Sequence, residues 1–147
     1  MLRRGITLLE MIIVLIIIGT TSAYAYPKLK TAQNKRSTQA ALREVTTQLA
    51  RAKATAVQRA CRATLKFKQS ENKVWITACK LTGSALDTIG TVSYLNARYG
   101  VTITVDQDSL PFGPNSLGLN TATTNMTFTK SGQTSTLTIS SIGRPTW

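Results

Sequence analysis

The chain has 147 residues, no histidine and six acidic residues against eighteen lysines and arginines, so that its net charge is +12. This length allows one domain in addition to a membrane anchor. Without histidine and with few carboxylates, the chain has few candidates for a general acid, a general base or a metal ligand, and we expect no enzyme, no metal site and no cofactor.

The first predicted element is an apolar helix that follows a short basic leader. The leader ends in Gly5, and residues 6–26 form a largely apolar run in which Glu10 is the only charged residue. About 21 helical residues are enough to cross a hydrocarbon core of about 30 Å. A carboxylate inside such a helix costs about 2–3 kcal/mol and needs a cation nearby. Cleavage after Gly5 would create that cation, because the new amine of Ile6 would lie one helical turn from Glu10.

This stretch resembles the class III signal of type IV prepilins and type II secretion pseudopilins. Gly5, Ile6, Thr7, Leu8 and Glu10 fall where that pattern needs them, although the family more often has phenylalanine in place of Ile6. The resemblance implies that a prepilin peptidase cuts after Gly5 on the cytoplasmic face and that the amine of Ile6 is methylated. It also implies that Glu10 pairs with the amine of a neighbouring subunit during assembly.

Two other interpretations of the stretch remain. An ordinary secretory signal has the same basic start and apolar core, and Ala23, Tyr24 and Ala25 would form its cleavage site. A plain membrane anchor with an incidental glutamate is the second. We prefer the prepilin interpretation because it gives Glu10 a role.

Gly19 and Pro27 interrupt the apolar helix, since glycine weakens a helix and proline removes a backbone donor. We expect the segment between them to be the soft part of the helix, and in the pilin family this is where the helix loosens on packing into a filament. A kink without functional consequence is the alternative.

The helix is predicted to continue to about residue 60 as an amphipathic half. Apolar residues recur there at steps of three and four: Leu42, Val45, Leu49, Ala52 and Ala56. We therefore divide the chain into a leader, residues 1–5, a transmembrane and assembly helix, residues 6–27, an amphipathic half, residues 28–60, and a β-rich globular domain, residues 61–147.

Alternating apolar and polar residues predict a hairpin over residues 63–79 with its turn near Ser70 and Glu71. Such a hairpin brings Cys61 near Cys79. Export would place both in an oxidising compartment, so we expect a disulfide bond. A redox or metal role needs more ligands than these two cysteines provide.

The rest of the chain is also predicted to be β-rich. We expect a strand over Tyr99–Val105, a loop over residues 106–120 and a second hairpin over residues 126–139, while residues 81–89 are ambiguous. Asp106 and Asp108 resemble the start of a calcium loop, but the glycine and distal glutamate of such a loop are missing.

The positive charge is concentrated in one part of the chain. Residues 28–80 contain thirteen lysines and arginines against two glutamates, a net charge of +11, whereas residues 81–147 contain three residues of each sign. This asymmetry is typical of a protein with a polyanionic partner, either nucleic acid or anionic lipid headgroups. The alternative is a charged face that meets solvent or acidic neighbouring subunits.

Later segments resemble the GspH/FimT group of minor pilins and pseudopilins. These segments are residues 49–57, Phe128 followed by Gly132, and the terminal pair Gly143 and Arg144. The resemblance implies an α+β, lollipop-like fold, in which a long N-terminal helix packs on a small antiparallel β-sheet or sandwich domain. It implies a minor pilin that primes or tips a type IV pilus, or a minor pseudopilin of a type II secretion system.

The same resemblance implies which partners the chain has and where in the cell it is located. Other pilins, prepilin peptidase and the inner-membrane assembly machinery are the implied partners. Before assembly the chain would cross the bacterial inner membrane once with its globular domain in the periplasm, and afterwards it would lie in a surface pilus or periplasmic pseudopilus.

Some members of this group bind DNA through a C-terminal Gly-Arg-x-Arg motif. Gly143 and Arg144 match that motif, whereas Thr146 replaces its second arginine. Arg144 could reach a phosphate and Trp147 could stack on a base; the alternative for Arg144 is a contact within the fold. The other candidate DNA-binding residues are Arg59, Arg62, Lys66 and Lys68.

Overall fold

The computed structural model describes residues 8–80, 85–120 and 122–147. The predicted processing residues, Gly5 and Ile6, lie outside the described residues. The chain divides into two compact units, residues 1–33 and residues 34–147.

The described part of the N-terminal unit is helical. Helix α1, Leu8–Gln58, begins here and continues through Gly19 and Pro27. By length and composition it is able to cross a membrane, and none of its apolar window is buried. The hydroxyl of Thr21 donates a hydrogen bond to the carbonyl oxygen of Ile17 at 2.8 Å, so this polar group is satisfied within the helix. The loosening expected between Gly19 and Pro27 stays a prediction.

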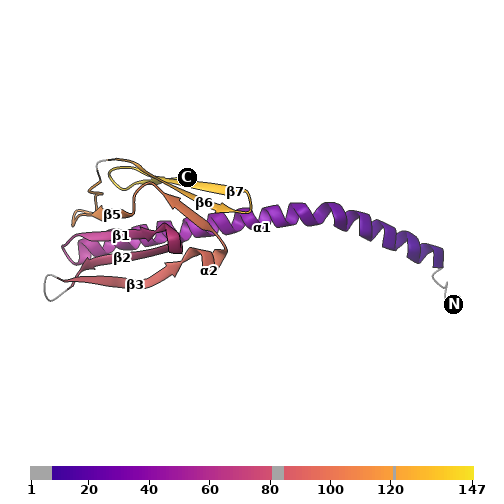
Figure 1. Ribbon diagram of the computed structural model, residues 1–147, viewed down its shortest axis with the longest axis horizontal. Helices are drawn as coiled ribbons and strands as arrows, with labels where there is room; N and C mark the ends of the chain where they lie inside the picture. Colours follow the sequence, from indigo (N-terminus) through magenta and orange to yellow (C-terminus); the bar gives the residue numbers. More distant parts are fainter. Residues whose placement is uncertain (1–7, 81–84, 121) are drawn as a thin grey trace, which may run out of the picture. The chain divides into compact units, whose positions relative to one another are not determined.

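Two four-stranded antiparallel sheets and the second half of α1 build the globular unit (Figure 1). In the first sheet the strand order is β3-β2-β1-β5, and in the second it is β4-β6-β7-β8. The strands of the first sheet are β1, Ala63–Lys68, β2, Lys73–Cys79, β3, Leu86–Tyr94, and β5, Ser109–Phe112. Those of the second are β4, Thr102–Val105, β6, Thr124–Lys130, β7, Gln133–Ile139, and β8, Pro145–Thr146.

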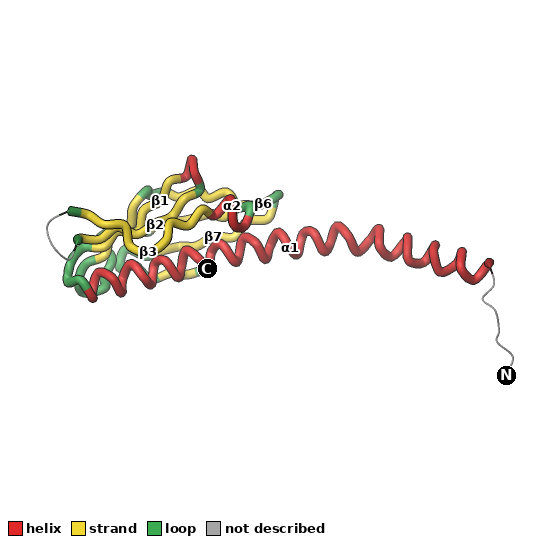
Figure 2. Tube along the Cα trace, turned by 90° about the horizontal axis from the view of Figure 1, so that it is seen from below, coloured by secondary structure: helices red, strands yellow, loops and turns green. Residues whose placement is uncertain are grey.

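One apolar core is shared by α1 and both sheets. Figure 2 shows strands of the globular unit running beside the second half of α1. Ala41, Ala52 and Ala56 are fully buried on that side of the helix, and their small side chains let the strands approach it closely. Phe112 and Phe128 are among the largest side chains that fill the core. This architecture confirms the predicted α+β fold, with a long helix packed on small antiparallel sheets.

Both predicted hairpins are confirmed. Strands β1 and β2 pair in the expected register, with Leu65 opposite Ile76, and a 3₁₀ turn, Gln69–Glu71, joins them. Strands β6 and β7 are joined by Ser131 and Gly132, which have φ angles of +46° and +79°. Two positive φ angles in a two-residue turn match the right-handed twist of a hairpin.

Two segments differ from the sequence-based prediction, and a third, residues 81–89, is ambiguous from the sequence. Tyr99 ends a short helix, α2, Leu95–Tyr99, instead of starting a strand, because Gly100 caps that helix at φ +64° and β4 begins only at Thr102. The predicted loop 106–120 contains β5, whose edge position in the sheet tolerates Pro111. Within the ambiguous range, strand β3 begins at Leu86.

Candidate functional site

The C-terminal turn that carries Arg144 is held by a network of backbone contacts. The backbone N–H of Gly143 donates to the carbonyl oxygen of Ser140 at 2.7 Å, and the N–H of Arg144 donates to Oγ of Ser140 at 3.0 Å. Gly143 is buried and has φ +84°, and a Cβ atom there would lie 2.7 Å from Cε1 of Phe112. The turn therefore needs glycine at this position for both its conformation and its packing.

Lys53 of α1 binds the C-terminal turn. Its Nζ donates a hydrogen bond of 2.6 Å to the carbonyl oxygen of Gly143 and lies 5.7 Å from the ring centroid of Phe112. Burial lowers the pKa of the Lys53 amine. No pattern in the sequence links Lys53 to Gly143, which lies ninety positions away.

Trp147 lies beside α1 in a groove of about 350 Å³. The groove is lined by Gln39, Leu42 and Arg43 of α1 and by Ser135 and Thr136 of β7. The indole of Trp147 is 78 % exposed. Arg43 and Arg144 are both exposed, and their guanidinium groups have no hydrogen-bonding or ionic partner among the residues the structure describes. An exposed indole and a guanidinium without a partner among the described residues thus line the same groove, a combination that the sequence did not predict.

The lysines of the first sheet have a different environment. Lys66 and Lys68 alternate with buried residues of β1, as predicted, so that they lie on the outer face of the sheet. Lys68 forms a hydrogen-bonded ion pair with Glu71, and Lys73 lies 3.8 Å from the second oxygen of the same carboxylate. The hydrogen bond from Lys68 lowers the pKa of Glu71, and the charges of both lysines act in the same direction. Glu71 therefore offsets part of the positive charge here.

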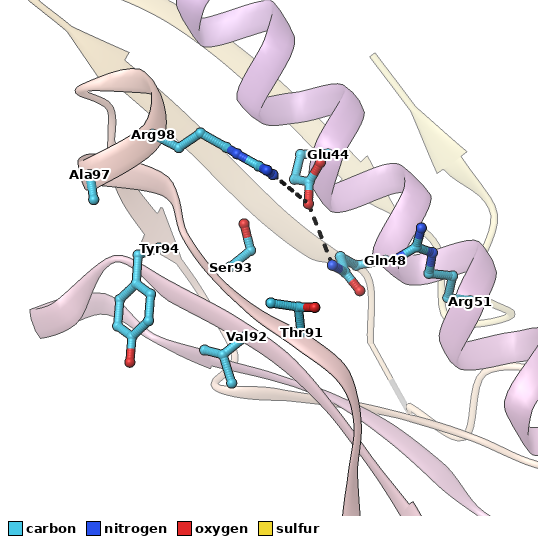
Figure 3. A pocket seen from close by; sticks show the side chains of 9 residues that line it. All are labelled: Glu44, Gln48, Arg51, Thr91, Val92, Ser93, Tyr94, Ala97 and Arg98. Carbon is cyan, nitrogen blue, oxygen red and sulfur yellow. Dashed lines mark hydrogen bonds and ion pairs between the residues drawn. The ribbon is translucent and has the colours of Figure 1, made fainter.

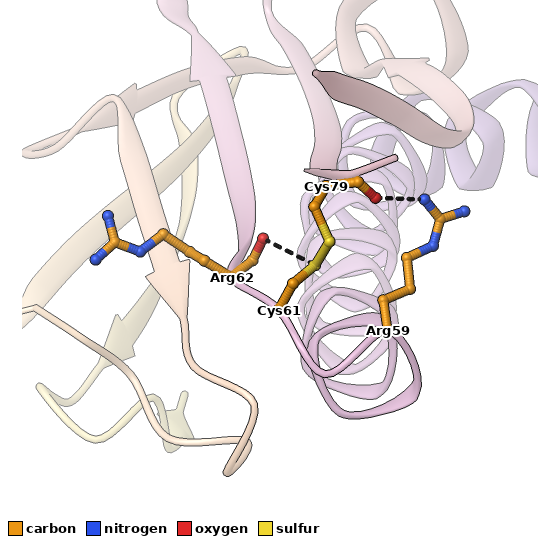
Figure 4. The surroundings of a disulfide bond; sticks show 4 residues. All are labelled: Arg59, Cys61, Arg62 and Cys79. Atoms are coloured by element: carbon orange, nitrogen blue, oxygen red, sulfur yellow. Dashed lines mark hydrogen bonds between the residues drawn. A yellow bond between two sulfur atoms is a disulfide. The ribbon is translucent and has the colours of Figure 1, made fainter. Parts of the chain in front are cut away.

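The disulfide between Cys61 and Cys79 is present, as predicted, with a Cα–Cα distance of 6.3 Å. Nη1 of Arg59 donates a hydrogen bond of 2.8 Å to the carbonyl oxygen of Cys79. Figure 4 shows the side chains of Arg59 and Arg62 on opposite sides of the disulfide. The guanidinium of Arg59 therefore binds within the fold, whereas Arg62 is exposed.

The candidate DNA-binding residues therefore do not form one continuous group. Arg144 and Trp147 belong to the C-terminal segment, and Trp147 lies beside α1. Lys66 and Lys68 lie on the outer face of the first sheet. Over residues 8–80, 85–120 and 122–147, no group of three or more cysteine, aspartate or glutamate side chains is placed to hold a metal ion.

Residues 1–26 match the prokaryotic N-terminal methylation motif. No curated protein sequence matches the chain.

Solved structures of two proteins share the fold. The type IV minor pilin FimU of Pseudomonas aeruginosa superposes with a TM-score of 0.57 at 17 % identity, over 74 % of this chain and 90 % of that one. A second crystal form of FimU gives a TM-score of 0.59. The minor pseudopilin EpsH from the type 2 secretion system of Vibrio cholerae gives 0.60 at 7 % identity, over 75 % of this chain and 94 % of that one. The chain thus joins a prepilin-type methylation motif to the fold of the minor pilins and minor pseudopilins, the group that its sequence resembles.

Proposed function

We propose that the chain is a minor type IV pilin, a structural subunit that is processed and then built into a pilus. Prepilin peptidase removes residues 1–5, and the amine of Ile6 is methylated. The apolar half of α1 holds the subunit in the inner membrane until the assembly machinery inserts it among other pilins. The observation that carries this proposal is the methylation motif of residues 1–26 at the start of a chain with a pilin-like fold.

Glu10 supplies the mechanism of assembly in this proposal. A carboxylate in a helix that crosses hydrocarbon is costly, and an amine of a neighbouring subunit removes that cost only when the two helices are in the correct axial register. The ion pair therefore selects one register. We place this chain at or near the tip of the filament, as its resemblance to the minor pilins implies.

Processing is tested by mass spectrometry of the full chain co-expressed with a prepilin peptidase. The expected product begins at methylated Ile6, and Gly5→Leu should remain uncleaved. Gly19→Leu is the matched control, because it alters a glycine of the same apolar stretch away from the cut and should be processed normally. A cut after Ala25 instead would identify an ordinary secretory signal.

Assembly is tested by measuring how much of the chain enters sheared filaments of a piliated host. Glu10→Gln keeps the size of the side chain and removes its charge, and we expect normal processing with most incorporation lost. Unchanged incorporation would contradict the role given to Glu10.

A minor pseudopilin of a type II secretion system is the alternative within the same class, and the shared fold with EpsH supports it. The two assignments predict different losses when the gene is deleted from its natural host. Loss of surface pili with normal protein secretion favours the pilin, whereas the reverse favours the pseudopilin.

DNA binding is a second candidate function. Residues 34–147 contain fourteen lysines and arginines against five acidic residues, a net charge of +9. The groove beside α1 combines the indole of Trp147 with the guanidinium of Arg43, which has no partner in the described part of the chain, and Arg144 lies three residues before Trp147. Phosphate contacts from arginine and stacking of a base on an aromatic ring are the two elements of single-strand binding.

The affinity of the full chain in detergent micelles for a single-stranded oligonucleotide, measured at several salt concentrations, tests this function. Arg43→Gln should reduce the slope of log affinity against log salt by about one phosphate contact. Trp147→Ala should weaken binding by about 1–3 kcal/mol per stacked base with little change in slope. Lys80→Gln is the control, because this exposed lysine is neither a candidate DNA-binding residue nor part of the groove. Equal losses in Arg43→Gln and in the lysine control, with no loss in Trp147→Ala, would mean that net charge alone attracts DNA.

A further inference from the structure

A polar cleft of about 540 Å³ lies between α1, the second half of β3 and α2. Figure 3 shows side chains from all three elements around it. Glu44, Gln48 and Arg51 come from α1, Ser93 comes from β3, and Arg98 comes from α2. None of these residues belongs to the C-terminal groove or to the apolar half of α1.

The cleft has more hydrogen-bond donors than acceptors. Oε1 of Glu44 lies 3.6 Å from Nη1 of Arg98 and 3.4 Å from Nε2 of Gln48, both longer than the about 2.7–2.9 Å of a strong charge-assisted bond. The exposed guanidinium of Arg51 has no partner in the described part of the chain. The cleft thus contains two guanidinium groups but one carboxylate, which contacts only Arg98 and does so loosely, so the site has room for another acceptor with negative charge.

Ser93 adds a buried donor that is not used. Its side chain is 7 % exposed, and its Oγ has no hydrogen-bond partner among the described residues. Figure 3 shows this hydroxyl directed into the space between β3 and α1. Buried polar groups are normally paired, so an unpaired one indicates a missing partner. The side chain of Arg98, which lines the same cleft, is 62 % exposed, and among the described residues it is held only by the long contact to Glu44.

One wall of the cleft is the free edge of a sheet. Strand β3 is the edge strand, and within the described residues it pairs only with β2. Ile76 pairs with Ile89 and Val74 with Ser93, so that residues 90–92 all lie opposite Trp75 in a bulge. Bulged residues lie outside the regular ladder, and edge strands offer their backbone groups to an added extended chain.

We propose that this cleft docks an extended segment of another protein that carries an aspartate or glutamate. Its carboxylate pairs with Arg51 and Arg98 and accepts the hydrogen bond of Ser93, while its backbone lies along the edge of β3. The excess of donors favours an acidic partner. The strand edge and a volume much larger than one carboxylate favour a peptide segment over a small anion. The inference stands whether or not the chain enters a pilus.

Peptide binding to the full chain in detergent micelles tests the charge requirement. The probe is a fluorescent eight-residue peptide of alternating threonine and valine with one central glutamate, and its twin has glutamine instead. We expect the glutamate peptide to bind about tenfold more tightly, and Arg51→Gln and Arg98→Gln each to remove most of that preference. Arg36→Gln, an exposed arginine of α1 outside the cleft, should leave it unchanged.

Two further measurements separate a docking role from a structural one. Ser93→Ala should leave the thermal stability of the free protein unchanged or higher, because it removes an unpaired buried hydroxyl, yet it should weaken binding of the glutamate peptide. The peptide should also slow hydrogen exchange of the amides of residues 91–94, which acetate should not do.

Equal affinity for the two peptides would overturn the proposal, as would an equal loss in the Arg36→Gln control. Full competition by acetate without protection of the β3 amides would reduce the cleft to a site for small carboxylates and would equally overturn peptide docking.

Discussion

Replacing Gly143 by alanine tests whether the C-terminal turn is clamped between α1 and the core. At φ +84° a residue with a Cβ atom costs about 1–2 kcal/mol. The new methyl group would also lie 2.7 Å from Cε1 of Phe112, which is 1 % exposed and cannot move without disturbing the core. Overpacking of this kind costs about 1–3 kcal/mol. We therefore expect Gly143→Ala to lower the free energy of unfolding by about 2–5 kcal/mol.

Gly132 provides a matched control for this variant. Its φ is +79°, nearly the same as that of Gly143, but no atom lies within 4 Å of the position a Cβ would take. Gly132→Ala should therefore lower the free energy of unfolding only by the cost of the positive φ angle, about 1–2 kcal/mol. Denaturant unfolding of the full chain, followed by tryptophan fluorescence, measures the free energy of unfolding of both variants. The comparison holds when both show the same dependence of that free energy on denaturant concentration. Equal losses in the two variants would refute the clamp against Phe112.

Three other variants have defined expectations for the free energy of unfolding. Removing the disulfide with Cys61→Ala/Cys79→Ala, which opens a loop of 18 residues, should cost about 3 kcal/mol in denaturant unfolding, and a loss below about 1 kcal/mol would contradict the chain-entropy estimate. Because the hydrogen bond from Lys68 lowers the pKa of Glu71 below its usual 4.5, the stabilising effect of Glu71 should be present above pH 4.5 and lost as the pH falls through the lower folded-state pKa. The free energies of unfolding of wild type and Glu71→Gln should therefore differ at pH 6 and agree at pH 2. Burial lowers the pKa of Lys53 from 10.5, so that on raising the pH the amine loses its proton in the folded state before it does in the unfolded state. The free energy of unfolding of wild type, relative to that of Lys53→Met, should therefore rise as the pH approaches 10.5. A flat difference between pH 7 and pH 10.5 would show that the amine is not desolvated.

Local patterns predicted much of the fold. The first hairpin and its disulfide followed from alternation over residues 63–79 and from the positions of Cys61 and Cys79, since partners in a hairpin are close in sequence. Strand β3 escaped this reasoning because most of its side chains are exposed and its bulge breaks the alternation. Strand β5 was hidden in a segment rich in proline and glycine, where only its pairing with β1 makes it a strand.

The candidate site residues likewise fall into those that local sequence patterns predicted and those that only long-range contacts brought together. The sequence marked Arg144 by its place in a motif and Trp147 by its aromatic ring, yet it placed Arg59 with them although that guanidinium is bonded to a backbone carbonyl. It also passed over Arg43, which the packing of α1 against β7 brings into the groove beside Trp147.

The sequence by itself determined the prepilin-type motif, the membrane-crossing length of the first helix and the hairpins, because each depends on residues that are neighbours along the chain. Only the tertiary structure decided which cations are free and which are bonded. Lys53 reaches the carbonyl of Gly143 across ninety residues, and the cleft of Glu44, Ser93 and Arg98 joins three elements. Such contacts follow from the order of strands in two sheets packed on one helix, and no local periodicity encodes that order.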